Sequence, residues 1–240
     1  MPVGTPWPHP AEGAGAGTKA RFQFWRTEPR RVRPISLLVT FPFVLFARKT
    51  MPPQHLNELL AWLKANPNRA SAGTFAAGQR LLCAFFRNET GTQFAFVPYR
   101  GEGAAIQDLI AGRIDLLFYS LDSLPLARSG SIKAYAVTGD TRSALAPEIP
   151  TMAEMGLPAV SYSTWFGFFA PKGTPREIIS RLNAATVEAL AEPAVRSRFM
   201  DLGLEIFPRE RQTPEALGAL QRSDADKWWP RIKEFGIKAE

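Results

Sequence analysis

Two glycine-containing segments of this chain have residue types and spacing that could bind a ligand. SAGT at 71–74 and YRGEG at 99–103 each adjoin a short apolar run and precede an expected helix. Unpaired backbone N–H groups and the positive end of a helix dipole meet where a strand leads into a helix. Such a position favours a small anion, such as a phosphate or a carboxylate. Ordinary packing is the alternative for both turns, and spacing alone leaves the two interpretations open.

A dinucleotide is excluded as the ligand of the second turn. GEGAAI at 101–106 has the pattern G-x-G-x-x-I, which is not a dinucleotide-binding fingerprint. No acidic residue stands about 20 positions further on at a strand end, where a ribose hydroxyl would be bound, and Asp122 is the nearest candidate. We therefore expect no nicotinamide cofactor, and the sequence indicates no other cofactor.

Residues that could perform catalysis are scarce. The chain has only two histidines, His9 and His55, and one cysteine, Cys83, which is expected in the core among apolar residues. No G-x-S-x-G elbow, Walker loop, H-E-x-x-H motif or Cys/His cluster is present. Asp115 and Asp122 lie at an expected strand end and turn, where solvation explains them better than acid–base chemistry. The sequence predicts neither an enzyme nor a metal site.

The net charge of +7 is confined to one end of the chain. Residues 1–50 contain eight Lys/Arg and two acidic residues, whereas the remaining residues contain 21 Lys/Arg and 20 acidic residues. No basic helix or basic–aromatic stripe follows residue 50, so nucleic-acid binding is not expected.

Strands and helices alternate along the part of the chain that contains the two turns. QHLNELLAWLKAN at 54–66 places leucines at helical spacing on one face. A short strand is expected to end near Ser71, with a turn and a second helix after it. Further strands are expected at 94–98, 114–118 and 132–139. Their short strand–helix–strand spacing predicts parallel pairing with a right-handed crossover and an α/β fold class.

The C-terminal third combines a long apolar strand, STWFGFFAP, with several helices. In the last helix, Trp228 and Trp229 are expected to anchor the helix rather than to form a binding platform. In the helix that follows the strand, Ile178, Leu182, Ala185 and Ala189 are expected to lie along one apolar face.

Residues 1–34 are expected to form an irregular, disordered head, because they are rich in Gly, Pro, Ala and Arg and lack periodicity. Residues 35–47 are interpreted as a buried strand that crosses between lobes, not as a signal peptide. This apolar run begins late, contains Pro42, and is followed by Arg48 and Lys49 where small cleavage-site residues would stand. It is also too short to span a bilayer. No export signal is recognisable.

Several segments together resemble one family, the periplasmic solute-binding proteins of tripartite tricarboxylate transporters, or Bug-type receptors. The resemblance runs in order from about Ile35 to Lys238. The segments that carry it are ELLAWLKANPNRASAGT, TGTQFAFVPYRGEGAAIQDLIAGRIDLLF, IKAYAVTGDTRSALAPEIPTMAEMGLP, STWFGFFAPKGTPREIISRLNAATVEAL and EPAVRSRFMDLGLEI.

This resemblance implies a two-lobed, type II architecture like that of periplasmic binding proteins, closing on a small carboxylate ligand. Residues 48–160 would form a complete α/β lobe, and 161–240 the returning strand and helices of the other, incomplete lobe. The chain would cross between lobes near 40–47 and again near 163–170. The family role is a monomeric periplasmic receptor that passes its ligand to membrane transporter subunits and performs no chemistry.

In the family, backbone amides and bridging waters at strand-to-helix loops hold the carboxylate. The resemblance therefore assigns one wall of the site to the two glycine-containing segments and the opposite wall to the returning crossover. The expected ligand-binding residues are Ser71, Ala72, Gly73, Thr74, Tyr99, Gly101, Gly103, Thr164 and Trp165.

Two departures from the family pattern bear on function. The family's opening segment, about a third of its length, is not matched, and residues 1–34 are interpreted as an out-of-frame or mis-started leader, or else as a different linker. TFAAGQR at 74–80 contains Phe75 and lacks the histidine that the family usually has at this turn. Phe75 would narrow the pocket or reject a second carboxylate. Weak or no ligand binding is therefore expected. The alternative function is a truncated or frameshifted, non-functional derivative of such a receptor.

Overall fold

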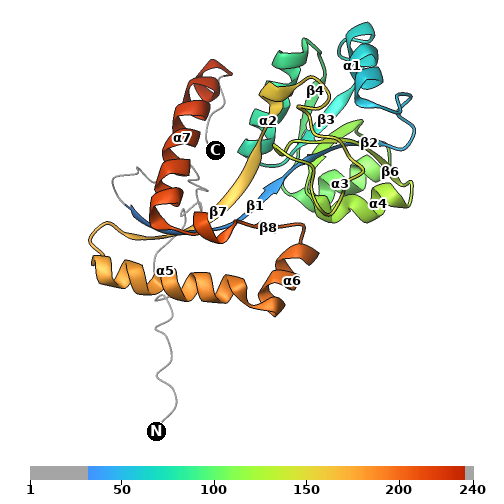
Figure 1. Cartoon of the computed structure of the whole chain (residues 1–240). Helices are drawn as coiled ribbons and strands as arrows, with labels where there is room; N and C mark the ends of the chain where they lie inside the picture. The colour runs from blue at the N-terminus through green and yellow to red at the C-terminus, as the bar shows by residue number, and fades with distance from the viewer. Residues whose placement is uncertain (1–31, 236–240) are drawn as a thin grey trace, which may run out of the picture.

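The computed structural model describes residues 32–235, which form two β-sheets (Figure 1). The larger sheet has the strand order β4-β3-β5-β2-β6, and the smaller one has the order β7-β1-β8. The strands are β1 Val32–Pro42, β2 Val44–Arg48, β3 Ser71–Thr74, β4 Ala95–Pro98, β5 Leu116–Tyr119, β6 Ile132–Val137, β7 Ser163–Pro171 and β8 Glu205–Ile206. Each sheet carries helices, and the expected α/β architecture with two lobes is confirmed.

The five-stranded sheet is covered by helices on both faces. β3 pairs in parallel with β4 and β5, as the short crossovers predict, whereas β2 is antiparallel to β5 and β6. α1 and α2 pack on one face, and α3 and α4 on the other. The seven α-helices within residues 32–235 are α1 Leu56–Ala65, α2 Ala77–Thr90, α3 Glu102–Ile110, α4 Leu124–Arg128, α5 Arg176–Ala191, α6 Pro193–Asp201 and α7 Pro214–Glu234.

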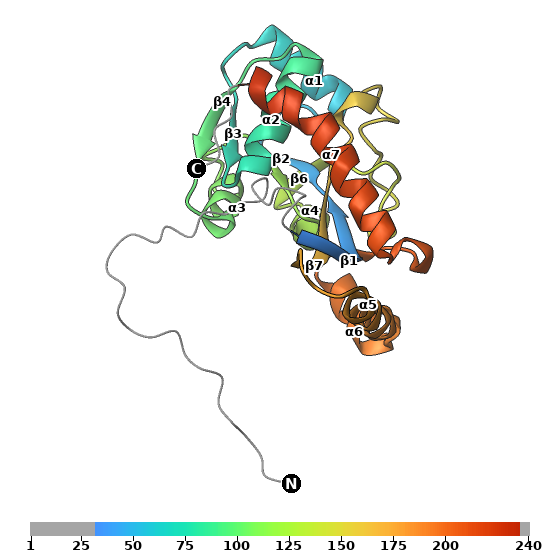
Figure 2. The same cartoon turned by 90° about the vertical axis from the view of Figure 1, so that its left-hand side faces the viewer.

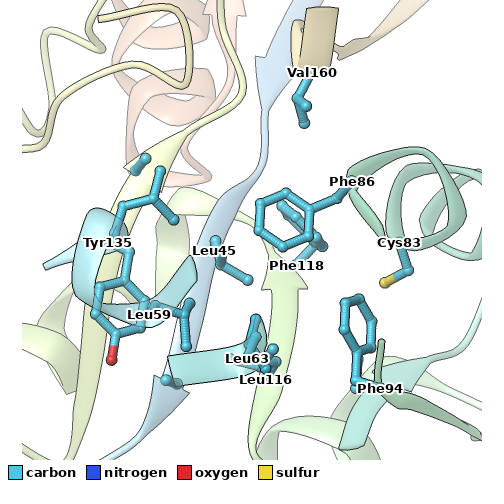
Figure 3. Close-up of a cluster of buried hydrophobic side chains, with 14 of the residues drawn as sticks. Leu45, Leu59, Leu63, Cys83, Phe86, Phe94, Leu116, Phe118, Tyr135 and Val160 are labelled. Atoms are coloured by element: carbon cyan, nitrogen blue, oxygen red, sulfur yellow. The ribbon is translucent and has the colours of Figure 1, made fainter. Parts of the chain in front are cut away.

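The core on the α1–α2 face is rich in aromatic rings (Figure 3). Phe86 of α2 is fully buried, and its ring centroid lies 5.6 Å from that of Phe118 and 6.3 Å from that of Phe94. Leu59 and Leu63 of α1 pack in the same layer, which confirms the leucine face predicted for that helix. Rings and leucines from three elements thus fill one continuous layer against the sheet.

Cys83 lies in the same layer and is expected to be chemically inert in the folded protein. Its side chain is fully buried, and burial raises the pKa of the thiol to about 12, so almost no thiolate forms at neutral pH. Iodoacetamide at pH 8 should alkylate Cys83 at least 100-fold more slowly in buffer than in 6 M urea, as followed by intact mass. Similar rates in the two solvents would contradict this burial.

The three-stranded sheet lies between two helices. β1 pairs with β7 along almost its whole length, and β8 adds only two residues beside Val39 and Thr40. α5 packs on one side of this sheet through Ile179, and α7 packs on the other through Leu217 (Figure 1). None of the helices within residues 32–235 is both long and apolar enough to cross a membrane.

The chain passes between the lobes at Phe43, where β1 ends and β2 begins. The buried Thr138, directly after β6, ties this point to the returning chain. Its hydroxyl accepts a hydrogen bond from the Phe43 N–H at 2.8 Å and donates one to the Tyr162 carbonyl at 2.6 Å. Its backbone N–H donates to the Phe43 carbonyl at 2.8 Å. One threonine therefore fixes both crossings relative to each other.

The last helix, α7, contacts both lobes (Figure 2). Near its start, Leu217 packs with Leu37 on the smaller sheet. Further along, Trp228 is 3% exposed and packs on Leu81 and Phe85 of α2. The prediction that Trp228 anchors the terminal helix is confirmed, although the helix is anchored on the larger lobe as well as on its own.

Three sequence-based expectations about these elements were wrong. Residues 35–47 are not one strand but parts of β1 and β2, which belong to different sheets. β1 begins at Val32, three residues inside the expected head, whereas residues 1–31 lie outside the described part of the chain. The SAGT segment is the strand β3 itself and not a turn, so the strand begins at Ser71 rather than ending there.

The apolar face predicted for α5 is exposed. Ile178 and Leu182 are 40% and 44% exposed, and Ala185 and Ala189 are exposed with them. The helix instead buries Ile179 and Leu190. The apolar stripe of α5 therefore has no covering element within residues 32–235.

Candidate anion-binding site

The carboxyl ends of β3 and β4 lead into two helix N-termini that lie side by side. Thr74 ends β3 and pairs with Pro98 at the end of β4. The Tyr99 N–H donates to the Thr74 carbonyl at 2.7 Å, which joins the loop before α2 to the loop before α3. Neither helix has a side-chain hydrogen bond at its N-cap. Both first turns therefore keep N–H groups that can bind an anion.

Two buried polar side chains in this region have unsatisfied atoms. Thr74 is 2% exposed and its Oγ1 has no hydrogen-bond partner, and the same holds for Oε1 of Gln79, which is 4% exposed. Burying such a group without a partner costs about 1–3 kcal/mol, so natural proteins rarely keep one without a reason. A polar ligand or a bound water at the end of β3 would satisfy the Thr74 hydroxyl.

The glycines at the start of α3 leave open space around the backbone. Gly101 is the N-cap residue with an extended backbone (φ −170°), and Gly103 is in the first turn. A Cβ atom added at either residue would meet no atom within 4 Å. The fold therefore does not need glycine at these positions, whereas a ligand approaching the N–H groups would benefit from the missing side chains.

Phe75 and Tyr119 form an aromatic pair beside Thr74. Their ring centroids are 5.8 Å apart in an edge-on arrangement. Burial, followed by the negative charges of Glu102 and Asp122, raises the pKa of Tyr119 to about 12, so its hydroxyl stays protonated at neutral pH. These two carboxylates oppose the binding of an anion, so the N–H groups at the helix starts must offset their charge.

Tyr99 contributes its backbone to this region, but its side chain is engaged elsewhere. The hydroxyl donates to Asp108 Oδ2 at 2.8 Å, in the last part of α3. Burial, with the Asp108 hydrogen bond and charge, raises the pKa of Tyr99 to about 12. The ring packs near Gly73, so the side chain has a structural role.

The first three residues of SAGT are not at the candidate site. Ser71 starts β3, and both its N–H and its hydroxyl donate to Asp115 Oδ2, at 2.8 and 3.0 Å. Asp115 also pairs with Arg48 at 2.6 Å. Ala72 is a buried core residue, and a Cβ at Gly73 would lie 2.8 Å from the Ile114 side chain, so packing accounts for these two. We therefore remove Ser71, Ala72 and Gly73 from the proposed site.

Thr164 and Trp165, expected as the opposite wall, have partners within their own lobe. The Thr164 carbonyl accepts from the Thr40 hydroxyl at 3.0 Å. The Trp165 ring packs beside Leu37 and Leu217, and its Nε1 donates to Asp224 of α7 at 2.5 Å. Burial raises the pKa of Asp224. Neither side chain is brought to Thr74 by a contact in the structure.

Thr74, Gly101 and Gly103 from the prediction thus lie at the strand ends, with Tyr119 close to them and Gln79 buried in the first turn of α2. Sequence reasoning missed Gln79 because a glutamine in a helix is normally solvated. Its spacing of five residues from Thr74 was a usable signal, since it places Gln79 in the first turn of α2. Among residues 32–235, no three His, Cys, Asp or Glu side chains are grouped so that they could hold a metal.

Substitution of Gly103 by alanine separates folding from binding at this site. Alanine should stabilise α3 by a few tenths to about 1 kcal/mol, because glycine is the poorer helix former and the new methyl group meets nothing. The same methyl group should lower the affinity for a carboxylate several-fold by occupying space above the N–H groups. Urea unfolding and ligand titration of the variant test both effects. A gain in stability with unchanged carboxylate affinity would remove this turn from the site.

Two α/β lobes joined at crossing strands, with helix N-termini at the strand ends of one lobe, are the arrangement found in two-lobed solute-binding proteins. Residues 21–237 match the family described as the tripartite tricarboxylate transporter family receptor. The chain belongs to this family. The match begins at residue 21, so the expectation that the similarity starts near Ile35 was wrong.

Relatives and solved structures agree with this assignment. The chain is 34% identical over 213 residues to the UPF0065 protein in the tcbD-tcbE intergenic region of Pseudomonas sp. strain P51, covering 86% of this chain and 62% of that protein. The periplasmic binding protein BugD superposes with a TM-score of 0.76 at 30% identity, covering 89% of this chain and 72% of that one. MatC from Rhodopseudomonas palustris with bound malate gives 0.75 at 30% identity, covering 89% and 74%.

The chain therefore spans less than two thirds of the length of the curated relatives that it matches, between 59% and 63% for three of them. The smaller sheet, with only three strands, is the part of the fold where this shorter length is visible. The expectation of an incomplete first lobe agrees with this coverage.

Proposed function

We propose that this chain acts as a solute-binding receptor for a small carboxylate, with one carboxylate group bound at the end of β3. The observation that carries the proposal is the Thr74 hydroxyl, which is buried and unpartnered beside two helix N-termini. A carboxylate accepts hydrogen bonds from a hydroxyl and from first-turn N–H groups, and the helix dipoles favour its charge. These donors match the acceptor oxygens of a carboxylate.

A small dicarboxylate is the ligand class we propose. The structural neighbour MatC was solved with bound malate, and its fold superposes over most of this chain. In this chain, the protonated Tyr119 hydroxyl and the half-buried Phe75 ring lie beside Thr74, so the space there is partly polar and partly apolar. The acids Glu102 and Asp122 would repel a second carboxylate held close by, which favours ligands whose two carboxylates are well separated.

We further propose that the receptor works in the periplasm as a monomer and delivers its ligand to membrane subunits of a tripartite transporter. The support is the family match and the neighbour BugD, a periplasmic binding protein. No catalytic step is part of this role. A reporter fusion that is active only outside the cytoplasm, joined to the full gene, would test the compartment.

Affinity should be modest, because the described residues supply donors from one lobe only. A single carboxylate held by N–H groups and one hydroxyl corresponds to a dissociation constant on the order of a millimolar. Titration of the isotope-labelled chain with succinate, malate and adipate up to tens of millimolar should shift the amide signals of Thr74, Gly101 and Gly103. Propylamine at equal ionic strength is the control ligand and should shift none of them.

The variant Thr74→Val gives the sharpest test of the site. Valine has the shape of threonine and lacks the unpartnered hydroxyl, so the folded protein should gain up to about 1–2 kcal/mol of stability. The affinity for dicarboxylates should fall at least fivefold in the same variant. Thr141→Val, at an exposed position in the same lobe, is the matched control and should change neither property. Unchanged binding in Thr74→Val would exclude the end of β3 as the site.

A non-functional derivative of a receptor is the second candidate function. It is favoured by the coverage of less than two thirds of the relatives and by the open strand β7. Under this alternative the larger lobe still folds, but no carboxylate shifts any amide signal at the ends of β3 and β4. The same titration therefore distinguishes the two proposals.

A further inference from the structure

The smaller lobe exposes apolar side chains on two neighbouring elements. On β7, Phe166 and Phe168 are 43% and 52% exposed, although most strand phenylalanines are buried. On α5, the stripe Ile178, Leu182, Ala185 and Ala189 is exposed at helical spacing. We call these six residues together the β7–α5 surface. A monomeric protein rarely leaves such a surface uncovered.

Both parts of this surface lie on the same side of the small sheet. Side chains alternate along a strand, so Phe166, Phe168 and Ala170 share one face of β7. Ala170 packs with Ile179, which places that face on the α5 side. The opposite face of β7 is covered by α7, where Trp165 and Phe169 pack beside Leu217. Only the α5 side of the sheet therefore has uncovered aromatic rings.

The backbone of β7 is open as well. The small sheet has the order β7-β1-β8, so β7 has one hydrogen-bonded neighbour among residues 32–235 and forms an edge. Its nine residues, STWFGFFAP, include no charged side chain, and all except Ser163 and Thr164 are apolar. Long apolar edges without charges readily accept another strand, and natural proteins normally protect them.

The charges near the surface argue for a protein partner. The exposed residues of α5 include both Arg176 and Arg181 and both Glu177 and Glu188. A membrane surface or a nucleic acid would require a cluster of one positive sign. Mixed charges around an apolar centre are typical of a surface that binds polypeptide.

We propose that the β7–α5 surface is the docking surface for a polypeptide that adds a strand along the free edge of β7 and packs apolar side chains on Phe166, Phe168 and the α5 stripe. The partner we assign is the part of a family member that this chain's match leaves uncovered. BugD superposes on 89% of this chain, yet more than a quarter of BugD has no counterpart here. The open edge and the uncovered stripe are where residues 32–235 offer that polypeptide a binding surface.

The test uses the full 240-residue chain and, as a separate polypeptide, the uncovered part of the Pseudomonas relative. We expect a one-to-one complex by calorimetry and sedimentation, with at least tenfold slower hydrogen exchange at the β7 amides in the complex. Phe168→Asp should weaken the complex at least tenfold. Ile110→Asp, at a 37% exposed position on α3 in the other lobe, is the matched control and should leave it unchanged. Circular dichroism and a melt verify that both variants fold.

Three results would overturn the proposal. The first is no complex, both for the separate polypeptide and for a version fused through a flexible linker. The second is a complex that Phe168→Asp leaves intact. The third is protection, in the chain alone, of the β7 amides that point away from β1. In dilute monomer this would mean that the chain covers its own edge. Such protection only at high concentration would mean that a second copy covers it. This test is independent of carboxylate binding, because it reads complex formation and amide exchange without a ligand.

Discussion

Replacing Phe86 by alanine is expected to lower the free energy of unfolding by about 3–5 kcal/mol, the range for removing a large aromatic side chain from a core. Phe86 is fully buried, and its ring contacts those of Phe94 and Phe118 in one aromatic layer. Alanine would leave a cavity that α2, held on both sides by packed elements, cannot close. Urea unfolding monitored by circular dichroism measures the change. Both curves are fitted with the same dependence of the unfolding free energy on urea concentration.

Phe168→Ala is the matched control for this prediction. Its ring is 52% exposed on the free edge strand, so the loss should stay below about 1 kcal/mol. The contrast between two substitutions of the same residue type reports how differently the two lobes bury their aromatic side chains. A loss of 3 kcal/mol or more for Phe168→Ala would mean that the β7–α5 surface is already covered in solution. A loss below 1 kcal/mol for Phe86→Ala would contradict the described core.

Replacing Trp228 by alanine should release the last turns of α7 from the larger lobe. The free energy that holds these turns on the lobe should fall by about 3–5 kcal/mol. The ring lies edge-on to Phe85 at 5.8 Å and to Tyr162 at 5.2 Å. The Arg231 guanidinium lies 4.2 Å from the centre of the Phe85 ring and adds to the same contact. Ile232 and Phe235 pack in the same cluster but are only partly buried, so the indole is the buried side chain of α7 at this contact.

Hydrogen exchange measures this release directly. In Trp228→Ala, amides from 224 to 235 should exchange at least 100-fold faster, while those of β2 and β5 should keep their protection. Trp229→Ala is the control, because Trp229 is 41% exposed and should change exchange by only a few-fold. If the two substitutions increased amide exchange equally, the Trp228 contact would not be what holds α7 on the larger lobe.

The larger lobe was largely predictable from sequence because its signals are local. The leucine spacing of α1 and the glycine that ends α3 each depend on a few neighbouring residues, and both elements are found where they were expected. The end of α3 is followed by Gly112 at φ 74°, the left-handed conformation that favours glycine. Such features need no knowledge of distant contacts.

The errors occurred where distant contacts decide. Residues 35–47 are one continuous apolar run, and only pairing with β7 on one side of Phe43 and with β5 and β6 on the other divides them between two sheets. Trp165 was assigned to a ligand because its bond to Asp224, 59 residues away, is not visible in a local pattern.

The candidate site was predicted only in part, because local rules place some of its residues and distant contacts decide the rest. Thr74, Gly101 and Gly103 follow from the rule that strand ends and helix starts meet, and the structure places them together. SAGT was interpreted as a turn, whereas it is the strand β3, and Ser71 at its start is bonded to Asp115. The unsatisfied hydroxyl of Thr74 depends on everything packed around it, so only the structure could reveal it.

The insertion of one lobe between β1 and β7 also determines the order in which the chain can fold. Pro42 pairs with Ser163, and the whole larger lobe lies between these two partners in sequence. Bringing such distant residues together from an unfolded loop of roughly 120 residues costs about 4 kcal/mol of chain entropy. When the larger lobe folds first, Thr138 already holds the two crossing points together, and that cost disappears. During synthesis the larger lobe would therefore act as the template on which the smaller sheet assembles.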